Sequence, residues 1–383
     1  MTETTAPTGE SILLCSSSVG AGHNAAALAI LEGIRRTCPE APAVFEDALE
    51  HVPSAFRLLY RGGYTLAVTK APRLYGLGYR MANRPGGPGR SVGERVRLWV
   101  ERRATRRYVA SVLRRRPVLV VATHYLVAPH LGRRIQRGEE GLRLWIVVTD
   151  QEAHRYWYAE GVERYFVANA DVADAVARWG VPAGRITVSG IPVHPHWTDP
   201  VDADEVRRRW KLPGDRPIVL FSGGTYFTLG PAAETVRAII AATDAHVIAL
   251  TGSDKRLLAA LSALPESPSR LTAVPMTRQG HELAHVASLM VTKAGGLTTA
   301  ECIAKGLAMV LTKPLPGQEA ANARLLAAEG AAVVAPTAEE VVGQVKRLLA
   351  DRQALADMRA SAARLFRPAT ETITRAIVEG RKG

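Results

Sequence analysis

The succession of a hydrophobic strand, a glycine loop and a helix opens both halves of this chain, and it limits the possible folds more than any other feature. Residues 11–15 form a short apolar run that leads through a glycine loop into an Ala- and Leu-rich stretch, residues 24–34. The same succession recurs at residues 217–221 and 231–242. It is typical of the first strand and helix of a doubly wound α/β domain.

Further apolar runs alternate with helical patterns along both halves. Such runs occupy residues 118–122, 144–148, 164–167, 186–188, 246–250, 271–274, 289–292, 308–312 and 332–334. Helical patterns lie between them, for example at residues 92–113 and 173–179. Strands that alternate with helices predict parallel sheets with helices on both faces. We therefore expect an α/β protein with two Rossmann-like domains.

A proline-rich stretch separates the predicted domains. Residues 191–200 contain three prolines and two histidines and show no apolar periodicity, as expected for a linker. We place the first domain at residues 1–195 and the second at 196–365, and we expect a C-terminal helix, 366–383, to pack back on the first domain. Ligands of doubly wound sheets bind at the carboxyl ends of the strands, so the two sheets would face each other across an interdomain cleft.

The composition excludes several classes of protein. Hydrophobic residues make up 47% of the sequence, which is too many for a disordered chain. The three cysteines form no CxxC pair, so we expect neither a disulfide scaffold nor a structural zinc site. No apolar stretch reaches the roughly 18–20 residues that a membrane-spanning helix needs. The polar and acidic N-terminus does not resemble a signal peptide.

The net charge of +13 is concentrated in one segment. Residues 57–116 contain 16 Lys and Arg but only 2 Asp and Glu, so the rest of the chain is close to neutral. Tyrosines and Trp99 occur among these cations. Arginines beside aromatic rings suit the surface of an anionic membrane. The alternative is a solvated helix face whose arginines reflect the Ala- and Arg-rich composition.

The first glycine loop carries a candidate base. Gly20 and Gly22 allow a tight turn and a close approach to a ligand, and the free N–H groups of the following helix favour an anion. A helix N-terminus also lowers the pKa of an imidazole, so a neutral His23 can accept a proton there. The loop is neither a GxGxxG fingerprint nor a Walker A loop, and a purely structural turn is the alternative.

A glycine loop in the second half suits a diphosphate. Gly295 and Gly296 join a predicted strand to a helix, where they would admit a diphosphate against the helix N-terminus. Glu301 follows one turn later and could bind both hydroxyls of a ribose. The alternative is a capping box with Thr298 at the N-cap and Glu301 at N3.

Polar residues at three other places suit ligand binding. A Pro/Gly loop delivers Gln318, Glu319 and Asn322 to a helix start, and such amides and carboxylates bind polyhydroxylated ligands. Asp150 and His124 follow predicted strands, whose carboxyl ends would face the cleft. A capping aspartate and a structural histidine are the alternatives. We find no DxD motif and no His/Cys cluster with zinc-ligand spacing, so we expect no metal.

The order and spacing of these motifs resemble the monogalactosyldiacylglycerol synthase and processive diacylglycerol glucosyltransferase family. That group belongs, with the N-acetylglucosaminyl transferase of the lipid II pathway, to glycosyltransferase family 28, whose members are inverting, metal-independent enzymes of the GT-B fold. The resemblance covers about residues 11–367. It rests on the two glycine loops at residues 20–23 and 222–225 and on residues 148–157, 162–168, 186–193, 292–298 and 316–319.

The resemblance implies a role for each matching position. His23 would be the general base or an acceptor-site residue, and Met276 lies where family members hold the uracil ring. The positions implied to bind the donor diphosphate, ribose and sugar are Gly223, Gly224, Thr225, Gly295, Gly296, Leu297, Thr298, Glu301, Pro316, Gly317, Gln318 and Glu319. The positions assigned to the acceptor site are Gly20, Gly22, His124, Asp150, His154 and Trp157.

Three positions depart from the family pattern. Ser18 stands where plant-type members have an acidic residue, so no second carboxylate base is available at that position. Ala294 replaces a common Pro or Ser. Residues 150–154 differ from the usual hydrophobic sequence after the aspartate, which indicates a different acceptor pocket.

The resemblance implies an enzyme that transfers a hexose from a UDP-sugar to a hydroxyl of a lipid acceptor such as diacylglycerol. His23 would remove the hydroxyl proton, and helix N-termini would stabilise the leaving diphosphate without a metal or other cofactor. It also implies a cytoplasmic protein that is peripheral on the inner face of an anionic membrane, with no nucleic-acid partner.

Three alternatives stay open. The first is the same donor chemistry on a soluble acceptor such as a secondary metabolite. The second is a nucleic-acid binder that uses the arginine-rich segment, although it would leave the glycine loops unexplained and lacks a recognised module. The third is a UDP-sugar epimerase with the same fold.

Overall fold

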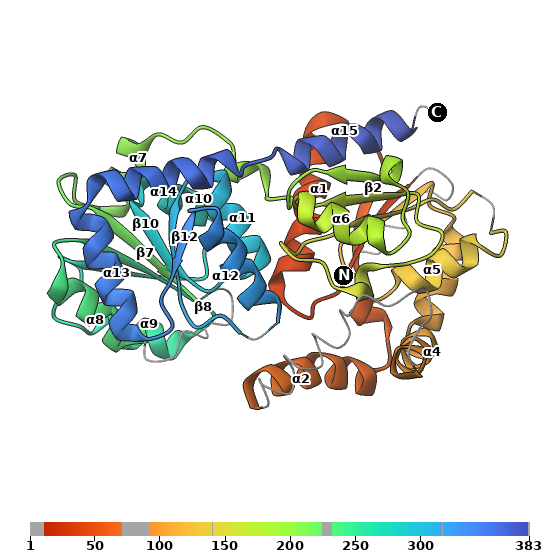
Figure 1. Ribbon diagram of the computed structural model, residues 1–383, viewed down its shortest axis with the longest axis horizontal. Helices are drawn as coiled ribbons and strands as arrows, with labels where there is room; N and C mark the ends of the chain where they lie inside the picture. Colours follow the sequence, from red (N-terminus) through yellow and green to blue (C-terminus); the bar gives the residue numbers. More distant parts are fainter. Residues whose placement is uncertain (1–10, 71–91, 140, 224–231, 316, 382–383) are drawn as a thin grey trace. The chain divides into compact units, whose positions relative to one another are not determined.

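The computed structural model describes residues 11–70, 92–139, 141–223, 232–315 and 317–381. The chain forms two compact units (Figure 1). Unit 1 comprises Met1–Pro195 together with Arg367–Gly383, and unit 2 comprises His196–Phe366. Each unit contains one six-stranded sheet in which all paired strands are parallel. The predicted α/β class is therefore confirmed.

The sheet of unit 1 has the strand order β2-β1-β3-β4-β5-β6. Its strands are β1 Ile12–Ser16, β2 Ala43–Asp47, β3 Leu119–Ala122, β4 Leu144–Val147, β5 Arg164–Val167 and β6 Ile186–Val188. The helices are α1 Ala21–Thr37, α2 Ser54–Lys70, α4 Val92–Arg115, α5 Ala128–Ile135, α6 Ala170–Arg178 and α15 Ala369–Arg381. Strands β1, β3 and β4 are neighbours, so their carboxyl ends meet at one edge of the sheet.

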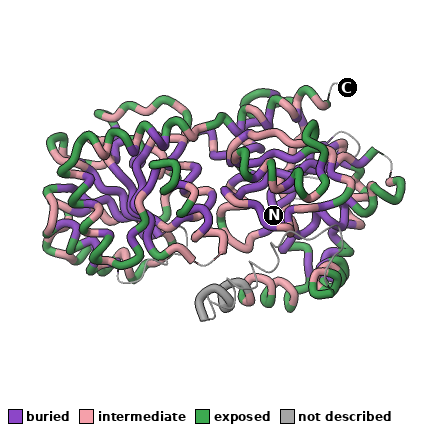
Figure 2. Tube along the Cα trace, in the orientation of Figure 1, coloured by how far each residue is buried: buried purple, intermediate pink, exposed green. Residues whose placement is uncertain are grey.

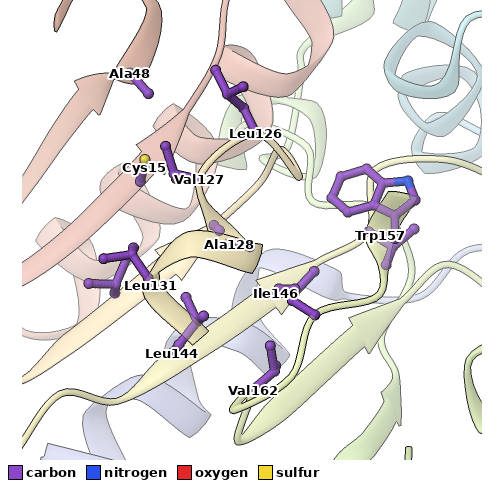
Figure 3. Close-up of a cluster of buried hydrophobic side chains, with 14 of the residues drawn as sticks. Cys15, Ala48, Leu126, Val127, Ala128, Leu131, Leu144, Ile146, Trp157 and Val162 are labelled. Carbon is purple, nitrogen blue, oxygen red and sulfur yellow. The ribbon is translucent and has the colours of Figure 1, made fainter. Parts of the chain in front are cut away.

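Both faces of this sheet are buried, which explains its nearly continuous apolar strands. In β1, Leu13 packs into one hydrophobic cluster and Leu14 into the other, because successive side chains point to opposite faces. Figure 3 shows part of the first cluster, which includes Ile146 and Trp157. The second cluster contains Ile373 of α15. A Cβ on Gly33 of α1 would lie only 2.6 Å from Oγ1 of Thr374, which also belongs to α15. Glycine at position 33 thus allows α15 to pack closely on α1.

The sheet of unit 2 has the order β12-β11-β10-β7-β8-β9. Its strands are β7 Ile218–Ser222, β8 His246–Gly252, β9 Leu271–Pro275, β10 Leu289–Thr292, β11 Ala308–Leu311 and β12 Ala332–Val334. The helices are α7 Ala203–Trp210, α8 Ala232–Ala242, α9 Lys255–Ser262, α10 Gly280–Val286, α11 Gly296–Ala304, α12 Gln318–Ala328, α13 Ala338–Ala350 and α14 Arg352–Arg364. Its central strands are buried as well (Figure 2), whereas the edge strands β12 and β9 are partly exposed.

The predicted strands are all present, with small shifts at their ends, but the sequence pattern does not predict β2. This strand has the sequence AVFED and lies at the sheet edge, where most of its residues are only half-buried. It therefore lacks the apolar run of a central strand. Within the described part of the chain, no helix is both long and apolar enough to span a bilayer.

Candidate functional site

A cluster of buried polar and aromatic side chains lies at the carboxyl ends of β1, β3 and β4 in unit 1. The first turn of α1 contributes His23, the end of β3 leads to residues 123–125, and the end of β4 leads to residues 149–157. These segments are at least 24 positions apart in the sequence, but the strand order brings them together. This edge is where doubly wound sheets bind their ligands.

His23 is held by hydrogen bonds from two neighbouring strand ends. Its Nδ1 lies 2.7 Å from Thr149 Oγ1, and Thr123 Oγ1 donates to the His23 carbonyl at 3.0 Å. The ring meets that of His124 edge-on, with 4.7 Å between centroids. Burial lowers the pKa of His23 to about 4, so the ring is neutral at physiological pH. The backbone carbonyl of Thr123 is a second polar contact of the ring, but no side chain in the described ranges bonds Nε2, and the residue is half-buried. That nitrogen is therefore available to a ligand.

His124 presents a hydrogen-bond donor. The backbone N–H of Leu126 donates to its Nδ1 at 3.1 Å, so in the neutral ring the hydrogen is on Nε2. Burial lowers the pKa of His124 well below its usual value, which keeps the ring neutral. The ring stacks on Tyr125 with a centroid separation of 4.2 Å.

Asp150, His154 and Trp157 form a buried group next to the two histidines. Trp157 Nε1 donates to Asp150 Oδ2 at 2.9 Å, and His154 Nε2 lies 3.8 Å from the same oxygen. Burial raises the pKa of Asp150 to about 7 and lowers that of His154 to about 3. Both shifts favour uncharged forms. Because Trp157 is fully buried, it supports Asp150 and contributes no accessible surface.

The glycine loop before α1 leaves backbone N–H groups without side-chain partners. Gly20 is the N-cap of α1 in an extended conformation, with no side-chain cap, and the first turn of the helix has no acidic residue. A Cβ on Gly20 would meet no atom within 4 Å. The space beside Gly20 is therefore open, and the close approach to a ligand that the glycines suggest stays a prediction.

Asp47 supports this loop, and sequence reasoning missed it because β2 was not predicted. Its Oδ1 accepts hydrogen bonds from the backbone N–H groups of Ser18 and Leu49 at 3.2 and 3.0 Å. Arg61 of α2 lies 3.6 Å from its other oxygen and also donates to the Ser18 hydroxyl. The end of β2 thus places a carboxylate next to Ser18.

A buried ion pair connects α4 to the loops of the cluster. Arg97 Nη1 donates to both carboxylate oxygens of Glu101 at 2.8–2.9 Å, and its guanidinium lies 4.1 Å from the centre of the Tyr156 ring. Glu101 is only 2% exposed and also bonds Tyr60 of α2. Sequence reasoning counted both charges as part of the basic segment. The spacing of four residues was the signal that could have paired them.

Three loops converge at one edge of the sheet in unit 2. Strands β11, β10 and β7 are neighbours, and their carboxyl ends lead to residues 312–319, 293–296 and 223 respectively. Gly223 is buried at the end of β7. The predicted donor residues Gly224, Thr225 and Pro316 lie outside the described residues. Met276 follows β9 and is 56% exposed, so its side chain does not fill the core.

The second glycine loop forms the N-terminus of α11. Gly295 is the N-cap, without a side-chain cap, and a Cβ there would meet nothing within 4 Å. The helix begins at Gly296, so its first N–H groups belong to Gly296, Leu297 and Thr298. The capping-box alternative is wrong, because the helix begins before Thr298 and places Glu301 beyond the first turn.

The environment of Glu301 suits the binding of neutral polar groups. Burial raises the pKa of its carboxyl to about 8, and no other side chain in the described ranges bonds it. A half-buried carboxyl with open hydrogen-bonding capacity suits a pair of hydroxyls.

The loop before α12 is tied to the loop before α11. Glu319 accepts from the Leu315 N–H at 3.1 Å and lies 3.3 Å from Lys293 Nζ. Asn322 is fully buried, and its amide donates to the Ala294 carbonyl at 2.8 Å. Gly317, the N-cap of α12, has φ of +99°, which only glycine adopts readily. Gln318 opens the helix. Lys293 is a partner that sequence reasoning did not identify.

Metal ligands do not gather in either cluster. Within the residues described by the structure, no group of three His, Cys, Asp or Glu side chains is close enough to hold an ion.

Two family descriptions match the chain, one in each half. Residues 23–193 match monogalactosyldiacylglycerol (MGDG) synthase, and residues 218–373 match the glycosyltransferase family 28 C-terminal domain. These ranges contain His23, the Asp150 cluster and both predicted donor loops that follow β10 and β11.

Two related sequences from Bacillus carry the same name. A processive diacylglycerol beta-glucosyltransferase of Bacillus cereus is 27% identical over 93% of this chain and 90% of its own length. A protein of the same name from Bacillus licheniformis is 29% identical over 65% of this chain, a match that spans 64% of the relative. Among solved structures, MurG of Acinetobacter baumannii superposes with a TM-score of 0.61 at 18% identity, covering 97% of this chain and all of that one. The expected GT-B fold is thereby confirmed.

Proposed function

Since the chain belongs to the glycosyltransferases that combine an MGDG synthase domain with a family 28 C-terminal domain, we propose that it transfers a hexose from a UDP-sugar to a hydroxyl of diacylglycerol or a similar lipid. The reaction inverts the anomeric centre and needs no metal. The observation that carries this proposal is the neutral His23, whose Nε2 is open at the edge of the sheet where such domains bind ligands.

The acceptor hydroxyl is activated by His23. A hydroxyl is a weak nucleophile, and a neutral imidazole that takes its proton during the attack speeds the step roughly 10²–10⁴-fold. The Nε2–H of His124, 4.7 Å away between ring centres, is a donor for a second oxygen of the acceptor. His154 is neutral, and the raised pKa of Asp150 reduces its negative charge, so this group favours a neutral acceptor.

The leaving UDP is stabilised by backbone N–H groups. Charge that develops on the diphosphate meets the free N–H groups at the start of α11 and the positive end of that helix. Glu301 binds the ribose hydroxyls, and Gln318 and Glu319 contact the transferred sugar. The names of the relatives, which include diacylglycerol, support the lipid acceptor.

The basic helices provide a membrane-docking surface. On α4, exposed apolar side chains recur at helical spacing, at Val92, Val96, Trp99 and Val100, and α2 exposes Leu58 and Leu59. Exposed arginines continue along α4 at Arg95, Arg102, Arg103, Arg106, Arg107 and Arg114. Apolar groups that enter a bilayer, beside cations that meet lipid phosphates, suit a peripheral enzyme on the cytoplasmic face of an anionic membrane. Residues 71–91 of the basic segment lie outside the described ranges.

The test is a transfer assay with purified protein, UDP-glucose or UDP-galactose, and liposomes with or without diacylglycerol. We expect glycolipid formation only with diacylglycerol, and His23→Ala should lower turnover by orders of magnitude while the variant still binds UDP. Transfer to a soluble acceptor at full rate without lipid would contradict the acceptor assignment. Full turnover by His23→Ala would remove His23 from the mechanism.

A further inference from the structure

The orientation of His23 depends on a hydroxyl in another strand. Imidazole can act as a base through Nε2 only when Nδ1 carries the hydrogen, and Nδ1 then needs an acceptor. The group at hydrogen-bond distance is Thr149 Oγ1, at 2.7 Å. We propose that Thr149 is a positioning residue that accepts the Nδ1–H of His23 and so fixes Nε2 as the basic nitrogen. This inference rests on the proposed role of His23.

Thr149 is well placed to hold the ring in one orientation. It directly follows β4 and is 4% exposed, so little water competes for its hydroxyl. Thr123, which follows the neighbouring strand β3, donates to the carbonyl of His23. One strand end thus holds the backbone of His23, and the next holds its ring.

In the described part of the chain, the polar contacts of the His23 ring are the Thr149 hydroxyl and the backbone carbonyl of Thr123. His124 packs edge-on against His23, and the Trp157 ring lies 6.1 Å away, centre to centre. Such contacts restrict the movement of the ring. A ring turned by 180° would place a C–H at Thr149 and lose the hydrogen bond.

A hydroxyl also differs from a carboxylate as the partner of a catalytic histidine. A carboxylate would stabilise the protonated ring and raise its pKa, whereas the neutral hydroxyl of Thr149 does not. Burial therefore keeps the pKa of His23 low, at about 4, and the base stays unprotonated at neutral pH.

The experiment compares Thr149→Val with Thr149→Ser and with Thr370→Val. Thr370 is a matched control, because it is a buried threonine of the same unit whose hydroxyl donates to the Val193 carbonyl. Nitrogen-15 NMR of histidine-labelled protein, with the His23 signals assigned from a His23→Gln sample, reports which ring nitrogen carries the hydrogen. Initial rates at varied UDP-glucose, with diacylglycerol liposomes, give kcat and KM.

We expect the unsubstituted protein to show the Nδ1–H form of His23. Thr149→Val should show a mixture of tautomers and a kcat about 10- to 100-fold lower, with the KM for UDP-glucose unchanged. Thr149→Ser should restore the Nδ1–H form and the kcat. Thr370→Val should match the unsubstituted protein in its tautomer and its kcat.

An Nε2–H form of His23 in the unsubstituted protein, or an unchanged tautomer in Thr149→Val, would overturn the inference. A failure of His23 as the base can be distinguished from a failure of this inference. If the tautomer shifts in Thr149→Val but turnover stays at its full value in both this variant and His23→Ala, the placement of Thr149 holds and the catalytic role of His23 does not.

Discussion

The indole N–H of Trp157 donates to Asp150 Oδ2 at 2.9 Å, and both side chains are buried in unit 1. Desolvation is the dominant cause of the raised pKa of Asp150, and the hydrogen bond from Trp157 opposes it. The two lie seven positions apart along the chain, so the segment that follows β4 provides both the carboxyl and its donor.

Trp157→Phe should destabilise the protein by about 1–3 kcal/mol, because it leaves a buried carboxyl oxygen with one donor fewer. The pKa of Asp150 should rise above about 7, since the lost bond favours the charged form. Urea unfolding and carbon-13 NMR titration measure the two effects. Trp210→Phe is the control, because the buried indole N–H of Trp210 has no partner in the described part of the chain. Equal losses in the two variants would contradict a role for the bond.

The ion pair between Arg97 and Glu101 should behave as a buried pair. Glu101→Leu leaves the Arg97 guanidinium uncompensated and should cost about 3–5 kcal/mol of unfolding free energy. The double variant Arg97→Met/Glu101→Leu should lose much less, because no buried charge is left without a partner. A double-mutant cycle measures this difference.

An exposed ion pair of the same unit provides the comparison for this cycle. Arg134 and Glu139 lie 3.1 Å apart, with side chains 50% and 30% exposed. Glu139→Gln should change the unfolding free energy by less than about 1 kcal/mol. Additive losses in the Arg97 and Glu101 cycle would show that the two side chains do not depend on each other.

The fold could be predicted wherever burial determines the residue types. Central parallel strands are covered on both faces, so they appear as apolar runs, and β10 was predicted at its observed bounds, Leu289–Thr292. The edge strand β2 is half-exposed and ends in Glu46 and Asp47, so no such run marks it.

The candidate site could be predicted only where its chemistry lies within one short segment. Gly20, Gly22 and His23 are adjacent, and a glycine loop before a helix predicts a ligand site from sequence alone. Thr149 is 126 residues from His23, and Asp47 is 29 residues from Ser18. Those contacts follow from the order of strands in the sheet, which a single sequence does not specify.

Glu301 should make stability depend on pH in unit 2. Its pKa in the folded protein is about 8, raised by burial from 4.5, so between these values the folded state retains a proton that the unfolded chain has lost. The unfolding free energy should therefore fall as the pH rises from about 4.5 to 8. Glu301→Gln removes this contribution, so the variant should gain stability relative to the unsubstituted protein over that interval.

Thermal unfolding of both proteins without ligand, at intervals from pH 5 to 9, measures this difference. A constant difference across the range would show that the carboxyl does not change its protonation there. The variant should also bind UDP more weakly if Glu301 holds the ribose.

Metal independence predicts that chelation leaves activity intact. The proposed mechanism stabilises the diphosphate with N–H groups, so EDTA should not change the initial rate of transfer from UDP-glucose. Loss of activity that Mg²⁺ or Mn²⁺ restores, measured with the same liposomes, would contradict the mechanism.

The exposed face of α4 should control membrane binding. Trp99 is 58% exposed and Val96 is 56% exposed, one turn apart among arginines, so the double variant Trp99→Ser/Val96→Ser should lose most of its sedimentation with anionic phosphatidylglycerol vesicles. Arg102→Glu/Arg103→Glu should weaken binding further as charge is reversed, since each cation near such a surface contributes about 1 kcal/mol.

Val334→Ser, at a 38% exposed position of β12 in unit 2, is the matched control and should bind normally. Binding to neutral phosphatidylcholine vesicles should be weak for all of them. Equal binding by the control and the Trp99→Ser/Val96→Ser variant would show that this helix face is merely solvated, which is the alternative that the arginine-rich composition left open.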